Sequence, residues 1–210
     1  MDSTDFVEIA CSYTSRQEFS AAVQVLSVGL KAKPSDWQPF RRTDSGLYGS
    51  FWSEEEFISY VSWDQKGTVY WVRPSYSQAC YWLAHAFTEL GECDEAASAL
   101  KCGIAMEPDH PELLCELAFL CAPERQEEAL TLYREASVSR PWMTSCQRAR
   151  ALRGCGTTLV ELKRYDEAQR ALLESLEVAP GNANAKSELR YVQHERGARQ
   201  AFCVNGLRVF

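Results

Sequence analysis

The chain has 210 residues, of which 46% are apolar and 24% are charged, and its formal net charge is −7 at pH 7. A chain of this length can bury the core of one or two domains, and its composition is that of an ordinary globular protein. The acidic balance argues against nucleic acid as a ligand, because phosphate contacts need a concentrated basic surface. No apolar run is long enough for a transmembrane helix, so no membrane insertion is expected.

The N-terminus and the cysteines both indicate a reducing compartment. The first ten residues contain Asp2, Asp5 and Glu8 and no basic residue, unlike a secretory signal peptide. We therefore expect a cytoplasmic protein whose nine cysteines stay reduced. Their odd number and the absence of a C-x-x-C pair disfavour a disulfide framework or a zinc site, and no cofactor is expected.

The first predicted unit is a helical hairpin over residues 3–36. Apolar and small residues recur there at helical spacing, and a proline ends the pattern. The residues that carry it are Ile9, Ala10, Tyr13, Phe19, Ala22, Leu26, Gly29 and Pro34.

Residues 37–76 form an aromatic-rich insert that interrupts the helical pattern. The stretch from Ser35 to Tyr76 holds 11 of the 24 aromatic residues, so we expect it to be folded rather than a disordered linker. The runs FISYVSW and TVYWVRP flank the turn sequence DQKG, which favours a β-hairpin over 57–73. The alternative is a short helix that begins at Ser53, with three glutamates in its first turn and a capping box closed by Glu56.

The second helical hairpin is predicted over residues 77–110. Gly91 ends its first helix and Pro108 ends its second. Small residues at positions 84, 96 and 103 let the two antiparallel helices approach closely. The pattern consists of Cys80, Leu83, Ala84 and Phe87 in the first helix and Ala96, Leu100 and Gly103 in the second.

Two further copies of this pattern follow, over residues 111–141 and 142–181. The extra length of the last copy predicts a first helix extended by residues 142–146. Residues 182–200 are predicted to form a closing helix, and 201–210 a tail. The second helix of the last copy carries Tyr165, Ala168, Leu172 and Pro180 at the offsets of Cys93, Ala96, Leu100 and Pro108.

The four copies resemble the tetratricopeptide repeat (TPR), a 34-residue helix–turn–helix unit. The resemblance covers residues 3–36 and 77–181. It implies an all-α fold, a right-handed solenoid of helical hairpins, with the insert placed after the first repeat. In this family the first helix of each repeat lines a concave groove.

The resemblance also implies which residues face that groove, through the second, fifth, ninth and twelfth positions of each repeat. They include Cys11 in the first repeat, Gln78, Tyr81, His85 and Thr88 in the second, Glu112, Cys115 and Phe119 in the third, and Arg150, Arg153 and Thr157 in the fourth. Guanidinium groups near aromatic side chains would suit a peptide with acidic groups or a C-terminal carboxylate. Further candidate contacts, because exposed aromatic residues anchor interfaces, are Trp52, Trp63 and Trp71 of the insert.

No sequence motif indicates an enzyme. The chain has no nucleophile elbow, phosphate loop or H-E-x-x-H motif, and the one thiol–imidazole pair that could be assembled is Cys11 or Cys115 with His85. We expect a non-catalytic protein–protein interaction module, an adaptor or scaffold that binds a partner peptide or protein in the groove. Two alternatives are a chaperone or assembly factor that shields a client, and a structural subunit that docks through the insert.

Overall fold

The computed structural model describes residues 5–206 except 65 and 123, with side chains described as far as residue 196. Within these residues the chain forms helical hairpins and one small β-sheet. The helices are α1 (Phe6–Ser15), α2 (Phe19–Lys31), α3 (Glu54–Trp63), α4 (Tyr76–Glu89), α5 (Cys93–Met106), α6 (Pro111–Cys121), α7 (Gln126–Ser137), α8 (Ser145–Glu161), α9 (Tyr165–Val178) and α10 (Ala183–Gly206). The strands are β1 (Phe40–Thr43), β2 (Gly46–Gly49) and β3 (Val69–Trp71).

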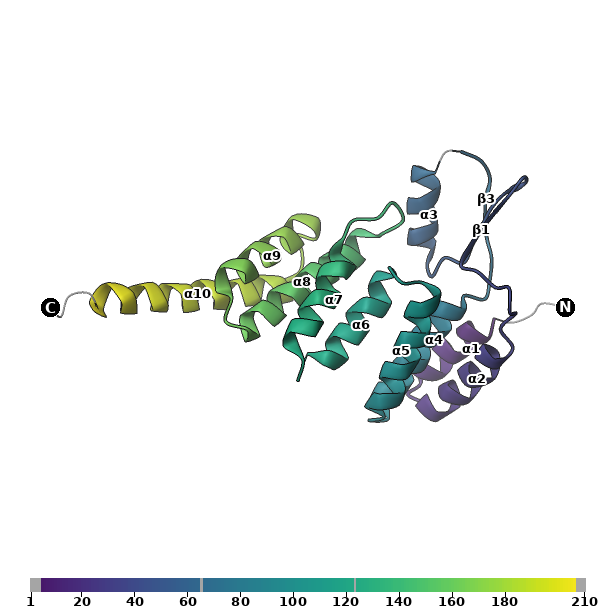
Figure 1. The fold of residues 1–210 in the computed structure, drawn as a ribbon, viewed down its shortest axis with the longest axis horizontal. Helices are drawn as coiled ribbons and strands as arrows, with labels where there is room; N and C mark the ends of the chain where they lie inside the picture. Colours follow the sequence, from purple (N-terminus) through teal and green to yellow (C-terminus); the bar gives the residue numbers. More distant parts are fainter. Residues whose placement is uncertain (1–4, 65, 123, 207–210) are drawn as a thin grey trace.

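The hairpins follow one another along an elongated molecule. The packed pairs are α1 with α2, α4 with α5, α6 with α7, and α8 with α9, and α10 packs on α9. The first helices also contact one another in sequence order, α1 with α4, α4 with α6, and α6 with α8. Figure 1 shows the N-terminal hairpin at one end, α10 at the other, and the insert protruding beside α4. The all-α solenoid predicted from the sequence is confirmed.

Left-handed residues end the first helix of three hairpins. Gln17, Gly91 and Lys163 have φ angles of 61°, 79° and 59°. This conformation stops the helix and reverses the chain, so the second helix begins within two residues. The structure thereby confirms the helix end predicted at Gly91, where glycine adopts the conformation without a steric cost.

Small residues set the close approach of helices within the second hairpin. Ala84 of α4 and both Ala96 and Gly103 of α5 are buried. A Cβ atom at Gly103 would lie 2.8 Å from a methyl carbon of Leu113 and 3.1 Å from the Cβ of Cys80. A larger side chain at position 103 would therefore push α5 away from α4 and α6.

The insert contains a three-stranded sheet in the order β1-β2-β3. Strands β1 and β2 are antiparallel, with Phe40 opposite Gly49. Strand β3 joins β2 in parallel, with Leu47 opposite Val69. A β-hairpin is therefore present in the insert, but it is formed by β1 and β2 and not by residues 57–73.

The segment that was expected to begin that hairpin is the helix α3. The side chain of Ser53 accepts a hydrogen bond from the backbone N–H of Glu56, which caps the helix N-terminus. Three glutamates lie in the first turn, where the helix dipole favours negative charge. Glu56 in turn accepts a hydrogen bond from the backbone N–H of Trp52 at 2.8 Å, so it closes the cap one residue earlier than a standard capping box. The alternative interpretation, a helix beginning at Ser53, is the one observed.

Two helices near the C-terminus differ in their bounds from the prediction. Helix α8 is longer than α1, α4 and α6, but it begins at Ser145, because Thr144 and Gln147 form a capping box there. Residues 142–144 therefore precede the helix. Helix α10 continues to Gly206, so it includes much of the predicted tail 201–210; residues 207–210 lie outside the described part of the chain.

Candidate functional site

Side chains of α4, α6 and α8 meet on one common face of the solenoid. The guanidinium group of Arg150 pairs with the carboxylates of Glu112 and Glu116. The hydroxyl of Tyr81 lies 3.5 Å from Oε1 of Glu116. These contacts join the three first helices of neighbouring hairpins. We call the surface around them the groove face.

The positive charge of Arg150 is already balanced by carboxylates of the same chain. Burial disfavours its charged form, but the carboxylates of Glu112 and Glu116 outweigh burial and raise the pKa of Arg150. The cluster of two carboxylates and one guanidinium has a net charge of −1 when all three are ionised. Arg150 is therefore not the free cation that the sequence led us to expect.

Two groove-face residues, Arg153 and Phe119, are available to a partner. Arg153 is half-buried and forms no ion pair with any residue that the structure describes. Phe119 is 58% exposed. Thr157 bonds to the backbone of its own helix at Gly154. The combination of an exposed ring and an unpaired guanidinium is typical of interface residues.

Cys115 lies beneath this surface. It is 1% exposed and packs in the core that runs through α4 to α10. Burial raises the pKa of its thiol, and burial also raises that of Cys11, to about 11. The expectation that Cys115 faces a partner is wrong, because its side chain points into the helix interface. Both thiols are protonated near neutral pH, which disfavours a thiolate nucleophile.

The N-terminal end of this surface has a pocket of about 240 Å³ between α1, α4 and the insert. The structure brings together here four of the residues predicted from the sequence, namely Cys11, Gln78, Trp52 and Trp71. The amide of Gln78 donates a hydrogen bond to the backbone oxygen of Trp52 at 3.1 Å. The guanidinium of Arg73 lies 4.6 Å from the ring centre of Trp71 and pairs with Glu8.

The remaining predicted residues lie apart from this pocket. His85 contacts the rings of Phe19 and Trp82, at centroid distances of 6.3 Å and 5.8 Å. Thr88 bonds to the backbone oxygen of Ala84. Trp63 is 59% exposed at the end of α3 and does not line the pocket.

The insert is attached to the solenoid by a buried cluster that we did not predict. The indole ring of Trp52 stacks on the imidazole of His110 with 3.6 Å between centroids, and Trp142 stacks at 5.5 Å from that imidazole. Nε1 of Trp52 donates to Glu107 at 3.2 Å. We call Trp52, Glu56, Glu107, His110 and Gln147 the insert lock.

Three ionisable groups of the insert lock are almost fully buried. Glu56, Glu107 and His110 are 3%, 6% and 3% exposed. Nε2 of His110 lies 3.4 Å from Oε1 of Glu56, and the side-chain amide of Gln147 donates to the same carboxylate. The insert is therefore held by α6 and α8 as well as by α4. No local sequence signal could reveal the lock, because its members come from three separate segments of the chain.

The two carboxyl groups of the lock have pKa values displaced in opposite directions. Burial raises the pKa of Glu107. Burial also acts against ionised Glu56, but His110, the backbone of Trp52 and the amide of Gln147 outweigh it and lower the pKa of Glu56. Ionised Glu56 therefore stabilises the folded state, and ionised Glu107 destabilises it.

We expect Glu107→Gln and Glu56→Gln to change stability with opposite dependence on pH. Because the folded-state pKa of Glu107 is raised, the wild-type protein loses stability as pH rises from the unfolded-state pKa through the folded-state pKa, and Glu107→Gln escapes this loss. The folded-state pKa of Glu56 is lowered instead. The stability that ionised Glu56 adds is therefore present above its unfolded-state pKa and is lost as pH falls through its folded-state pKa, and Glu56→Gln lacks this added stability. Urea unfolding from about pH 2 to pH 8 covers both windows, that of Glu56 below its unfolded-state pKa and that of Glu107 above its own. Variants that shift stability with the same sign across this range would contradict these assignments.

Comparison with known proteins agrees with this architecture. Residues 155–182 match the family model described as tetratricopeptide repeat. Similar solved structures include PilF of Pseudomonas aeruginosa, with 16% identity, 92% of this chain and 68% of that chain covered, and a TM-score of 0.66. MamA has 14% identity, coverage of 91% and 86%, and a TM-score of 0.61. The first TPR of Spaghetti (RPAP3), bound to an HSP90 peptide, has 20% identity, coverage of 58% and 93%, and a TM-score of 0.52.

The chain is therefore a helical-repeat protein with the tetratricopeptide-repeat fold. Comparison with curated proteins gives no match. Among the described residues, no helix is both long enough and apolar enough to cross a membrane. The same residues contain no group of three His, Cys, Asp or Glu side chains placed to hold a metal ion.

Proposed function

We propose that this protein is a non-catalytic adaptor or scaffold that binds a partner peptide or protein along the groove face. The observation that carries the proposal is that neighbouring first helices present an exposed ring, Phe119 of α6, and a guanidinium without an ion pair among the described residues, Arg153 of α8. The pocket beside Trp52 and Trp71 extends this surface toward the insert. TPR domains such as that of RPAP3 hold a peptide, which supports a peptide or protein as the partner here.

Arg153 is the residue we assign to an acidic group or C-terminal carboxylate of the partner. Arg150 is already paired with two carboxylates, so a partner anion near it would meet a net negative charge. An arginine side chain can bind a carboxylate through two parallel hydrogen bonds, which gives orientation as well as affinity. The cysteines with described side chains are all free, which fits a reducing compartment such as the cytoplasm.

A pull-down from native lysate tests the groove proposal with the variant Phe119→Ala/Arg153→Glu. We expect partners of the wild-type protein to be lost, because the variant removes an anchor ring and reverses the charge. The matched control is Val138→Ala/Arg170→Glu, since Val138 is 56% exposed and Arg170 is exposed without an ion pair among the described residues. Circular dichroism checks that both variants keep their helicity.

The outcomes separate the candidate roles. A partner that the control retains and the groove variant loses supports the adaptor role, and its terminus can then be tested as a synthetic peptide. A partner that both variants retain would contradict the groove proposal and indicate docking through the insert, where Ile58 and Trp63 are exposed. A client that precipitates from the lysate when this protein is absent would instead assign a chaperone role.

A further inference from the structure

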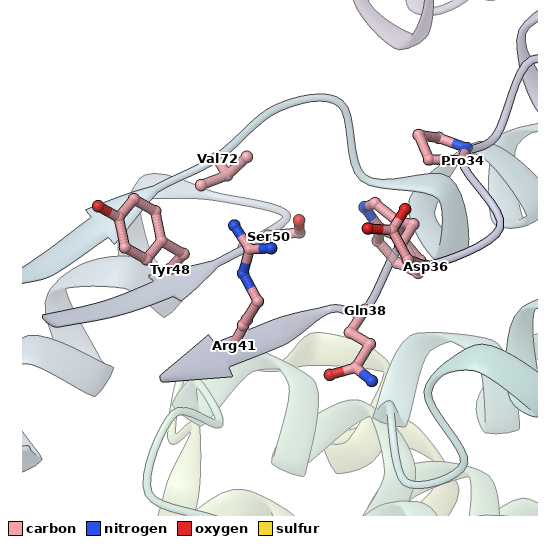
Figure 2. A pocket seen from close by; sticks show the side chains of 8 residues that line it. Pro34, Asp36, Gln38, Arg41, Tyr48, Ser50 and Val72 are labelled. Carbon is pink, nitrogen blue, oxygen red and sulfur yellow. The ribbon is translucent and has the colours of Figure 1, made fainter. Parts of the chain in front are cut away.

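A second pocket lies between the segment after α2 and the β-sheet of the insert (Figure 2). Its volume is about 210 Å³, and its lining includes Asp36, Trp37, Arg41, Tyr48 and Ser50. Pockets for drug-sized ligands have volumes of about 300–1,000 Å³, so this one fits a smaller molecule. It is separate from the groove-face pocket and has no part in the proposed function.

The pocket contains two opposite charges that form no ion pair in the described part of the chain. Arg41 and Asp36 are both exposed at the pocket, and they form no ion pair with each other or with another described residue. The guanidinium carbon of Arg41 lies 5.9 Å from the ring centre of Tyr48, another wall of the pocket. The adjacent Arg42, in contrast, pairs with Asp64, and most arginines with described side chains are also paired. Figure 2 shows the guanidinium of Arg41 directed into the pocket beside the Ser50 hydroxyl, with Asp36 on the opposite side.

The aromatic walls of the pocket are held in place from behind. Tyr48 stacks on Tyr70 with 4.8 Å between ring centroids, and Trp37 packs edge-on against Tyr76 at 5.3 Å. Val72 adds an apolar surface. Walls that are already ordered reduce the entropic cost of ligand binding.

We propose that this pocket binds a small zwitterion, an amino acid with an apolar side chain. Its carboxylate pairs with Arg41 and accepts a hydrogen bond from Ser50, and its ammonium group pairs with Asp36. Its side chain lies against Trp37 and Val72. A ligand with a single charge would leave either Arg41 or Asp36 unpaired, whereas a zwitterion satisfies both.

Calorimetric titration of the full chain with L-leucine tests the proposal. Two analogues serve as comparisons: N-acetyl-L-leucine lacks the ammonium charge, and L-leucinamide lacks the carboxylate charge. We expect L-leucine to bind with a Kd of about 1 mM or lower, and either blocked analogue to bind about tenfold more weakly. Arg41→Gln and Asp36→Asn should each weaken L-leucine binding by a similar factor. Arg170→Gln, which removes an unpaired arginine elsewhere, should leave binding unchanged.

Pairing each variant with the matching analogue locates the two contacts. In Asp36→Asn, acetylation of the ligand should cost no further affinity, and in Arg41→Gln, amidation should cost none. The absence of L-leucine binding up to about 10 mM would overturn the proposal. Equal affinity for the three ligands, or binding that depends on Arg41 and not on Asp36, would also overturn it. None of these variants changes the groove face, so this test and the pull-down can fail independently.

Discussion

Replacement of His110 by alanine is expected to lower the free energy of unfolding by about 2–5 kcal/mol, because it empties the space of a buried imidazole that packs beside the Glu56 carboxylate. The variant also removes the ring that lies between Trp52 and Trp142. Urea unfolding followed by far-UV circular dichroism measures the loss. Hydrogen exchange should become faster in the insert, since its attachment to α6 is weakened.

His85→Ala is the control for the loss of an imidazole. His85 is half-buried and contacts the rings of Phe19 and Trp82, and it forms no ion pair with a carboxylate among the described residues. We expect it to cost about 1 kcal/mol. Equal destabilisation by the two variants, with unchanged exchange in the insert, would show that His110 contributes packing alone.

Leu172→Ala is expected to lower the free energy of unfolding by about 2–5 kcal/mol, because Leu172 is 0% exposed in the core between α8 and α9. The same urea experiment measures this loss. Leu173→Ala provides the neighbouring control, since Leu173 is 41% exposed on the same helix and should change stability by much less. A similar cost at both positions would contradict the packing described here.

The space for Leu172 is provided by Gly156. A Cβ atom at position 156 would lie 2.6 Å from side-chain carbons of Leu172, so Gly156→Ala alone should cost about 1–3 kcal/mol. In the double variant Gly156→Ala/Leu172→Ala, the shorter side chain at position 172 leaves room for the new methyl group at position 156. Its cost should therefore be smaller than the sum of the two single costs. Strict additivity in this cycle would contradict a direct contact.

The helical hairpins were predictable because their packing rules are local. Small residues at positions 84, 96 and 103 mark where helices touch, and the structure confirms that all three are buried. The end of a helix at Gly91 follows from the conformational freedom of glycine, and it too is observed. Spacing along one helix is fixed by its 3.6-residue period, so such patterns need no knowledge of distant segments.

The insert was harder to predict because its structure depends on distant pairing. β-branched and aromatic residues in FISYVSW favour a strand, yet the cap at Ser53 and the contacts of Glu56 make this segment a helix. Strand β3 pairs with β2, which lies on the far side of α3 in the sequence. A parallel pair joined by a crossover has no short turn signal that marks it.

Repeat positions predicted some contacts of the groove face and missed others. Arg150, Glu112 and Tyr81 do lie together, as their positions in the repeat imply. Glu116 was missed, although it follows Glu112 by four residues and therefore lies on the same face of the helix. Including that spacing would have shown that Arg150 has two acidic neighbours.

The insert lock changes how the solenoid should open. In a repeat array whose units touch only their neighbours, one unit can unfold while the rest persist. Here Gln147 of α8 donates to Glu56 of α3 across a sequence separation of 91, and Trp52 connects to both α4 and the residue preceding α6. The insert lock spans three successive hairpins. We therefore expect α4 to α8 to unfold as one cooperative block, while fraying starts from α10.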